Sequence, residues 1–148
     1  MKESSRGSYW LEPASAEDRL WLYQLYEESL RPVIDEAVGW DDEDQRRRFG
    51  RSYEAEKFQL ITQGSTRAGA LYTIAQPENL HLSLLLIHED FRNRSLGTQI
   101  IEDIQKEQAG GPITLSVFKN NPAVSFYKRL GFRVDVEDEY FLEMSWRP

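Results

Sequence analysis

The sequence contains no cysteine and only two histidines, His81 and His88. Without cysteine the chain can form no disulfide, no thiolate nucleophile and no cysteine-based zinc site. Two histidines also make a His-rich metal centre improbable, so we expect no metal. No stretch of the sequence approaches the roughly 18 apolar residues of a membrane-spanning helix, and the first residues lack the apolar segment of a signal peptide. We therefore expect a cytoplasmic protein with no membrane partner.

Positive charge is also scarce. The chain has 18 Lys and Arg residues against 25 Asp and Glu residues, which gives a formal net charge of −7. An acidic chain is a poor candidate for nucleic-acid binding, and only the run RRRF at 46–49 favours that function. A length of 148 residues, with 40% hydrophobic residues, is enough for one self-sufficient core. We predict a single domain over 1–148.

Hydrophobic periodicity predicts a mixed α/β fold in which helices and strands alternate along the chain. The run 80–87 is apolar on both faces towards its end, as is typical of a central strand covered on both sides. The predicted elements are an edge strand at 8–13, a helix over 15–30, an irregular segment over 31–39, a helix after Trp40, strands at 57–63, 68–76 and 80–87, a helix over 96–109, a strand at 112–118, a helix over 122–130 and closing strands at 132–138 and 139–146.

The junction at 87–97 reads IHEDFRNRSLG, where a predicted strand leads into the N-terminus of a helix. Free backbone N–H groups and the helix dipole favour an anion at such a point. Arg92 and Arg94 add positive charge, and Gly97 allows a ligand to approach the backbone without meeting a Cβ atom. These features favour a diphosphate ligand. The alternative is that both arginines are merely solvated side chains.

A second motif, NNPAVSFYKRLGF, occupies 120–132. Asn121 is suited to cap a helix that has Pro122 at its first position. Gly131 fits the left-handed position after the helix, from which Phe132 can pack back on the last turn.

Two side chains of this motif can address the same ligand. Asn120 lies seven residues before Tyr127, about two helical turns, so both can face one side. Ala123 lies between them and leaves room on that side. The alternative for Tyr127 is a tyrosine of the core.

Together the two motifs resemble those of the GNAT superfamily of acetyl-CoA-dependent N-acetyltransferases. The resemblance covers nearly the whole chain in element order, and its specific part is 82–132. The family loop Q/R-x-x-G-x-G/A reads here Arg92-Asn93-Arg94-Ser95-Leu96-Gly97. The later family pattern N-x-x-A…FY…GF is present as Asn120, Ala123, Phe126, Tyr127, Gly131 and Phe132.

The resemblance implies the GNAT fold, a central mixed and mostly antiparallel sheet flanked by helices, and acetyl transfer to a primary amine by direct attack in a ternary complex. It implies that Tyr127 protonates the departing thiolate, that the acceptor is a small molecule or a peptide, and that the chain can form a homodimer. The residues it implies for acetyl-CoA binding are Leu85, Leu86 and Ile87 for the pantetheine arm and acetyl group, Arg92, Asn93, Arg94, Ser95, Leu96, Gly97 and Thr98 for the pyrophosphate, and Asn120 for the pantetheine.

The chain departs from the family pattern in two ways. Ser95 stands at the first glycine of the loop, where a positive φ would cost a serine about 1 kcal/mol. Leu84 and Leu115 stand where relatives often carry a glutamate that serves as the general base. His81 is a candidate base in their place because histidine is the side chain suited to exchange protons near neutral pH, and ordered water is another candidate. The departures also leave open a non-catalytic protein of the same fold that binds acyl-CoA or a protein partner.

For the acceptor amine we consider the segment around Trp40. An aromatic face beside the carboxylates of Glu36 and Asp41 would attract a cationic amine. The alternative is that the acidic residues only favour the N-terminus of the following helix and that Trp40 packs against the core.

Overall fold

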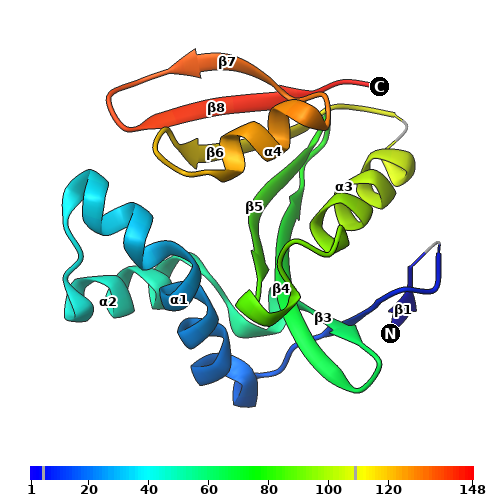
Figure 1. The fold of residues 1–148 in the computed structure, drawn as a ribbon, viewed down its shortest axis with the longest axis horizontal. Coiled ribbons are helices and arrows are strands. Elements are labelled where there is room, and N and C mark those ends of the chain that lie inside the picture. The colour runs from blue at the N-terminus through cyan, green and yellow to red at the C-terminus, as the bar shows by residue number, and fades with distance from the viewer. Residues whose placement is uncertain (5, 109) are drawn as a thin grey trace.

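A computed structural model describes residues 1–4, 6–108 and 110–148, and these residues build one eight-stranded sheet in the order β1-β2-β3-β4-β5-β6-β8-β7 (Figure 1). All neighbouring strands are antiparallel except β5 and β6, which are parallel. The strands are β1 (Lys2–Glu3), β2 (Trp10–Pro13), β3 (Gln59–Gln63), β4 (Thr66–Ala75), β5 (Leu80–Ile87), β6 (Ile113–Phe118), β7 (Arg133–Glu137) and β8 (Phe141–Trp146). The helices are α1 (Arg19–Val38), α2 (Asp42–Ser52), α3 (Leu96–Glu107) and α4 (Ala123–Arg129), with 3₁₀ turns at Ala16–Asp18, Ala55–Lys57 and Glu89–Phe91.

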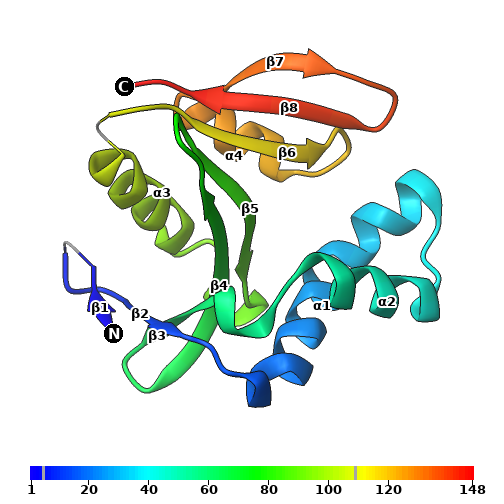
Figure 2. The ribbon, with the colours of Figure 1, turned by 180° about the vertical axis from the view of Figure 1, so that it is seen from behind.

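The helices cover the sheet from both sides, as the two opposite views show (Figures 1 and 2). Leu22 of α1 and Phe49 of α2 belong to a core on one face. Ile100 of α3 and Tyr127 of α4 belong to a second core on the other face. The strand 80–87 predicted to be central is β5, and it has neighbours on both edges. Among the described residues, no helix combines the length and the apolar character needed to span a bilayer.

Helix α1 is longer than the sequence pattern predicts. The irregular segment expected over 31–39 is helical up to Val38, with Pro32 inside the helix, and Gly39 ends it with a φ of 88°. A proline inside a helix removes one backbone hydrogen bond and typically costs about 3 kcal/mol. Val33 and Ile34 follow it and are buried, at 8% and 4% exposure. Their burial offsets the loss, and local helix propensity does not reveal it.

Most other predicted elements are confirmed, with small shifts at their ends. The strand predicted to be an edge is β2, and the two-residue β1 covers its outer side. Strand β3 begins two residues later than predicted, because Ala55–Lys57 forms a 3₁₀ turn.

The predicted C-terminal end of α4 is confirmed, whereas the helix begins one residue later than predicted, at Ala123, with Pro122 at the N-cap position. The backbone N–H of Ala123 donates to Oδ1 of Asn121 at 2.9 Å. Gly131 has a φ of 94°, and the N–H of Phe132 donates to the carbonyl of Tyr127 at 3.1 Å. These bonds satisfy groups that a helix end leaves free.

A β-bulge in β5, which the sequence does not reveal, changes which side chains face which core. Tyr72 of β4 pairs with Leu84, but the next residue of β4 pairs with Leu82, so Ser83 is the extra residue. Without a bulge Leu82 and Leu86 would share a face. Leu82 instead belongs to the core under α3 and Leu86 to the core under α1.

Strands β5 and β6 are paired over only part of their length. Leu80, His81 and Leu82 pair with Ile113, Thr114 and Leu115, and no pairing continues beyond them. The rest of β5 keeps its other neighbour β4 as far as Ile87. One edge of β5 from the bulge onward therefore offers backbone groups that no strand of the described chain uses.

Candidate active site

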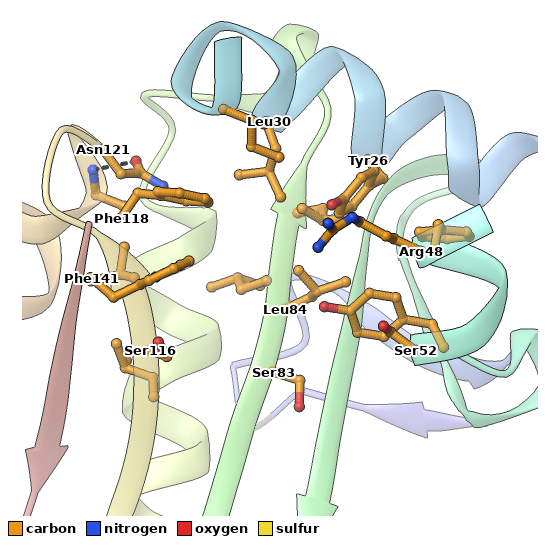
Figure 3. A pocket seen from close by; sticks show the side chains of 18 of the residues that line it. Tyr26, Leu30, Arg48, Ser52, Ser83, Leu84, Ser116, Phe118, Asn121 and Phe141 are labelled. Carbon is orange, nitrogen blue, oxygen red and sulfur yellow. Dashed lines mark hydrogen bonds between the residues drawn. The ribbon is translucent and has the colours of Figure 1, made fainter. Parts of the chain in front are cut away.

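Two cavities of about 880 Å³ each lie on either side of the opening between β5 and β6. We call one the loop cavity, because the loop 92–95 and the start of α3 form its wall. We call the other the aromatic cavity, because Tyr26, Phe49, Tyr53, Phe118 and Phe141 line it (Figure 3). The cavities meet at the six residues that line both of them, which are Leu30, Leu85, Leu86, Asn121, Ala123 and Tyr127.

The segment from Asn93 to Thr98, most of which lines the loop cavity, contains a row of backbone donors. Asn93 and Ser95 both adopt left-handed conformations, with φ of 61° and 64°. Ser95 therefore has the positive φ that a glycine would adopt at lower cost. The first bond of α3 runs from the N–H of Gln99 to the carbonyl of Ser95 at 3.0 Å. Within the described residues, no hydrogen bond uses the N–H groups from Asn93 to Thr98. Such a row at a helix N-terminus is suited to an anion.

The residues predicted to hold acetyl-CoA gather almost completely around this cavity. Arg94 is the exception, since it does not line the cavity and its guanidinium lies 5.7 Å from the ring centroid of Phe91. The predicted residues that do line the cavity are Leu85, Leu86, Ile87, Arg92, Asn93, Ser95, Leu96, Gly97, Thr98 and Asn120.

Arg92 is already engaged by the protein. Its Nη2 lies 2.8 Å from Oε2 of Glu28 on α1, and its Nε donates to the carbonyl of Ile87 at 2.8 Å. Arg92 thus joins α1 to the end of β5, and its charge is matched by Glu28. Arg92 is therefore not a free cation for a phosphate, because it is paired with a carboxylate 64 residues away in the sequence.

Asn120 and Gly97 each have a structural contact beside the cavity. Nδ2 of Asn120 donates to the carbonyl of Val33 at 3.0 Å, which fixes the turn before α4 against α1. A Cβ atom on Gly97 would lie 3.3 Å from Cζ of Phe126. The glycine therefore allows α3 to pack closely on α4 in addition to leaving the backbone accessible.

Tyr127 lies at the junction of the two cavities and is 8% exposed. Its ring makes edge contacts with Phe126 and Phe132, at centroid distances of 5.2 and 5.5 Å. Within the described residues its hydroxyl makes no hydrogen bond. Burial raises the pKa of Tyr127 to about 12, so the phenol keeps its proton at neutral pH.

His81 faces the aromatic cavity at the start of β5. Its Nδ1 lies 2.9 Å from Oγ1 of Thr114, and that hydroxyl also accepts a hydrogen bond from Nδ2 of Asn79 at 3.0 Å. Leu84 and Leu115, which replace the glutamates of relatives, line the same cavity. That part of the wall is therefore apolar.

The structure does not bring the three predicted acceptor residues together. Glu36 lines the loop cavity, and neither Trp40 nor Asp41 lines either cavity. Nε1 of Trp40 donates to Oδ1 of Asp42 at 2.7 Å. Oδ1 of Asp41 accepts from the N–H of Asp44 at 2.8 Å and so caps α2. The carboxylates of this segment serve the helix N-terminus, where free N–H groups attract them.

The aromatic cavity contains residues that the sequence analysis did not select. Arg48 of α2 and Tyr26 of α1 line it, together with Phe118 and Phe141 from the other side of the opening (Figure 3). Asp44 and Arg48 are four residues apart in a predicted helix, and this spacing favours an ion pair between them. Nothing local indicated that this pair faces a cavity.

An amide cradle beside a split parallel strand pair, with a buried tyrosine at the split, is the arrangement that the resemblance to acetyl-CoA-dependent acetyltransferases implies. The sequence model of the acetyltransferase (GNAT) domain matches residues 36–146. The chain therefore belongs to the GNAT acetyltransferase family, and its co-substrate is acetyl-CoA. No curated protein sequence matches the chain.

Solved structures share the fold over nearly the whole chain. The PaiA N-acetyltransferase from Thermoplasma acidophilum, solved with coenzyme A, is 20% identical with a TM-score of 0.75, over 95% of this chain and 99% of that one. An acetyltransferase from Thermus thermophilus is 26% identical with a TM-score of 0.72, over 95% and 97% of the two chains. Arabidopsis thaliana Naa50, solved with the bisubstrate analogue CoA-Ac-MVNAL, is 18% identical with a TM-score of 0.61, over 93% and 97%.

Proposed function

We propose that the protein transfers an acetyl group from acetyl-CoA to a primary amine by direct attack in a ternary complex. The observation that carries this proposal is the meeting of two cavities at Tyr127. A coenzyme in the loop cavity and an amine in the aromatic cavity would approach each other from opposite sides of the same opening. Holding two reactants in this way removes much of the entropic barrier to their reaction.

The loop cavity offers groups suited to each part of the coenzyme. The row of N–H groups from Asn93 to Thr98 would bind the pyrophosphate, and the positive end of the α3 dipole adds to the attraction. The unpaired edge of β5 at Leu85 and Leu86 would hold the pantetheine arm through backbone hydrogen bonds. Oδ1 of Asn120 would accept a further one, since its Nδ2 is used by α1.

Acetyl-CoA supplies the acetyl group as a thioester, and Tyr127 would supply the proton that the departing thiolate needs. Its raised pKa keeps the phenol protonated, which is the form that a general acid requires. Backbone N–H groups on the free edge of β5 would stabilise negative charge that develops on the acetyl oxygen.

The general base that we propose is His81. In this role Nδ1 must carry the proton and donate it to Oγ1 of Thr114, so that Nε2 has the free lone pair. Four residues of strand separate His81 from Leu85, about 13 Å. Ser83 and Ser116 line the cavity between them, and water held by their hydroxyls would relay the proton.

A second candidate function is a non-catalytic member of the family that binds acyl-CoA or a protein partner. The observation that favours it is the apolar wall at Leu84 and Leu115, where no carboxylate can accept a proton. Acetyl-CoA-dependent thiol release in the presence of amines separates the two functions, because only the enzyme produces free thiol.

The first test is the melting temperature of the wild type and of Gly97→Glu with and without acetyl-CoA. A ligand at 100 times its dissociation constant should add about 2.7 kcal/mol to the free energy of unfolding. We expect this rise in the wild type and its loss in Gly97→Glu, whose carboxylate would lie in the anion cradle. Gly110→Glu is the matched control, because a Cβ there meets nothing within 4 Å. Absence of a rise in the wild type would refute the proposal.

A further inference from the structure

The charged side chains of the aromatic cavity are few and come from one helix. Of the described Asp, Glu, Lys and Arg residues, only Asp44 and Arg48 line it, and both belong to α2. The remaining wall is mainly aliphatic and aromatic, and includes Leu30, Ile34 and Leu84. This composition restricts the chemistry of the acceptor amine that the cavity can hold.

The carboxylate of Asp44 is occupied. Its Oδ2 accepts from Nε of Arg48 at 2.7 Å, and its Oδ1 lies 3.8 Å from Nη2 of Arg47. With two guanidinium groups beside it, this carboxylate does not offer a free negative charge to a cationic substrate. Glu36, Trp40 and Asp41, which the sequence suggested for that task, lie outside the cavity.

The outer end of Arg48 remains available. The contact with Asp44 uses Nε, and no hydrogen bond within the described chain uses its two terminal nitrogens. Figure 3 shows the guanidinium reaching from α2 towards β5, beside Tyr26 and Leu84. Burial raises the pKa of Tyr26 to about 12, and the positive charge of Arg48 opposes that rise.

We propose that the acceptor is a primary amine with an apolar or aromatic body and a carboxylate at its far end, and that Arg48 binds this carboxylate. The inference rests on the proposed acetyl transfer and names its substrate class. The planar end of a guanidinium is matched to a carboxylate in two parallel hydrogen bonds. An apolar body would be buried between α1, β5 and the aromatic rings. A polyamine would place its second cation against Arg48 with no free carboxylate to balance it.

The test compares acceptors of equal length that differ only at the far end. The probes are hexylamine, 6-aminohexanoic acid and hexane-1,6-diamine, with para-methylbenzylamine and para-(aminomethyl)benzoic acid as an aromatic pair. Acetyl-CoA-dependent thiol release gives kcat/KM for each probe. In the wild type we expect the kcat/KM of each acid to exceed that of its neutral counterpart by about fivefold, the upper end for an ion pair with a partly exposed arginine. The diamine should be the poorest acceptor.

The variant is Arg48→Gln, and the control is Arg47→Gln, which removes the same charge from the same helix outside the cavity. Arg48→Gln should abolish the preference for the acids by raising the KM of each acid. Arg47→Gln should keep the preference. Circular dichroism melts of both variants should coincide, since both side chains are 65% exposed and a glutamine suits a helix.

The possible failures are distinct. If hexylamine or hexane diamine reacts as well as the acid in the wild type, the carboxylate class is wrong while acetyl transfer stands. If the preference survives in Arg48→Gln, Arg48 is not the binding group. If no amine releases thiol although acetyl-CoA raises the melting temperature, the proposed transfer itself fails and the inference falls with it.

Discussion

Tyr127 combines three properties that a proton donor to a thiolate needs. It lies where both cavities meet, its hydroxyl has no partner within the described residues, and burial keeps it protonated. Packing alone would explain a buried tyrosine, but a core phenol normally finds a hydrogen-bond partner. Its place in the walls of both cavities is what distinguishes the functional interpretation.

We predict that Tyr127→Phe lowers kcat by about a hundredfold, the lower range for loss of a general acid, without weakening acetyl-CoA binding. Because the raised pKa lies near 12, the wild type should also show no loss of rate from this group up to pH 10. Steady-state rates and titration of the coenzyme measure both effects. Tyr140→Phe is the control, since that tyrosine lines neither cavity. An unchanged kcat in Tyr127→Phe would exclude it as the acid.

At the scale of elements, α2 contributes to the site through Arg48, whereas its first residues stabilise the helix itself. Its acidic N-terminus follows the rule that carboxylates stabilise helix starts, and Asp41 caps it. About two turns after this cap, Arg48 lines the aromatic cavity. The cap fixes where the helix begins and therefore which of its arginines faces the cavity.

Replacing the cap should change stability but leave catalysis intact. We expect Asp41→Ala to lower the free energy of unfolding by about 1 kcal/mol, as for other N-caps, and Asp41→Asn to lower it by much less. Denaturant titrations measure the first effect, and the KM of the amine measures the second. A raised KM in Asp41→Asn would show that this carboxylate contacts the acceptor after all.

At the scale of the whole molecule, both cores contain tyrosines that are neutral when folded. Burial raises the pKa of Tyr26 and Tyr127 to about 12 and also raises that of Tyr53. The pKa of Tyr9 is raised by burial and by its hydrogen bond to Asp103, at 2.7 Å. These groups link the stability of the fold to alkaline pH.

The sign of this linkage follows from the raised values. Above pH 10 the unfolded chain loses phenolic protons that the folded chain retains, so unfolding becomes more favourable as the pH rises. We predict that these tyrosines do not change the melting temperature from pH 8 to about 10. From there towards pH 12 they should lower it steadily. Calorimetry at a series of pH values measures it, and Tyr9→Phe should reduce the slope. A flat profile up to pH 11.5 would contradict the prediction.

How far the sequence predicts this molecule depends on the range of the interaction concerned. The caps at Asn121 and Gly131 and the positive φ at Ser95 were predictable because each depends on hydrogen bonds or sterics within a few residues. Most residues predicted to bind the coenzyme line one cavity for the same reason, since each family motif is a continuous segment.

Contacts between distant segments decided the rest. The burial of Val33 and Ile34 allows α1 to continue beyond Pro32. The bulge at Ser83 arises in the pairing of β5 with β4. Glu28 matches Arg92 across 64 residues. The sequence by itself determined the order of the elements, their caps and the family motifs, because these depend on neighbours in the chain. Only the tertiary structure decided which charges are already paired and that Arg48 faces the second cavity, because burial and ion pairing arise when remote segments pack together.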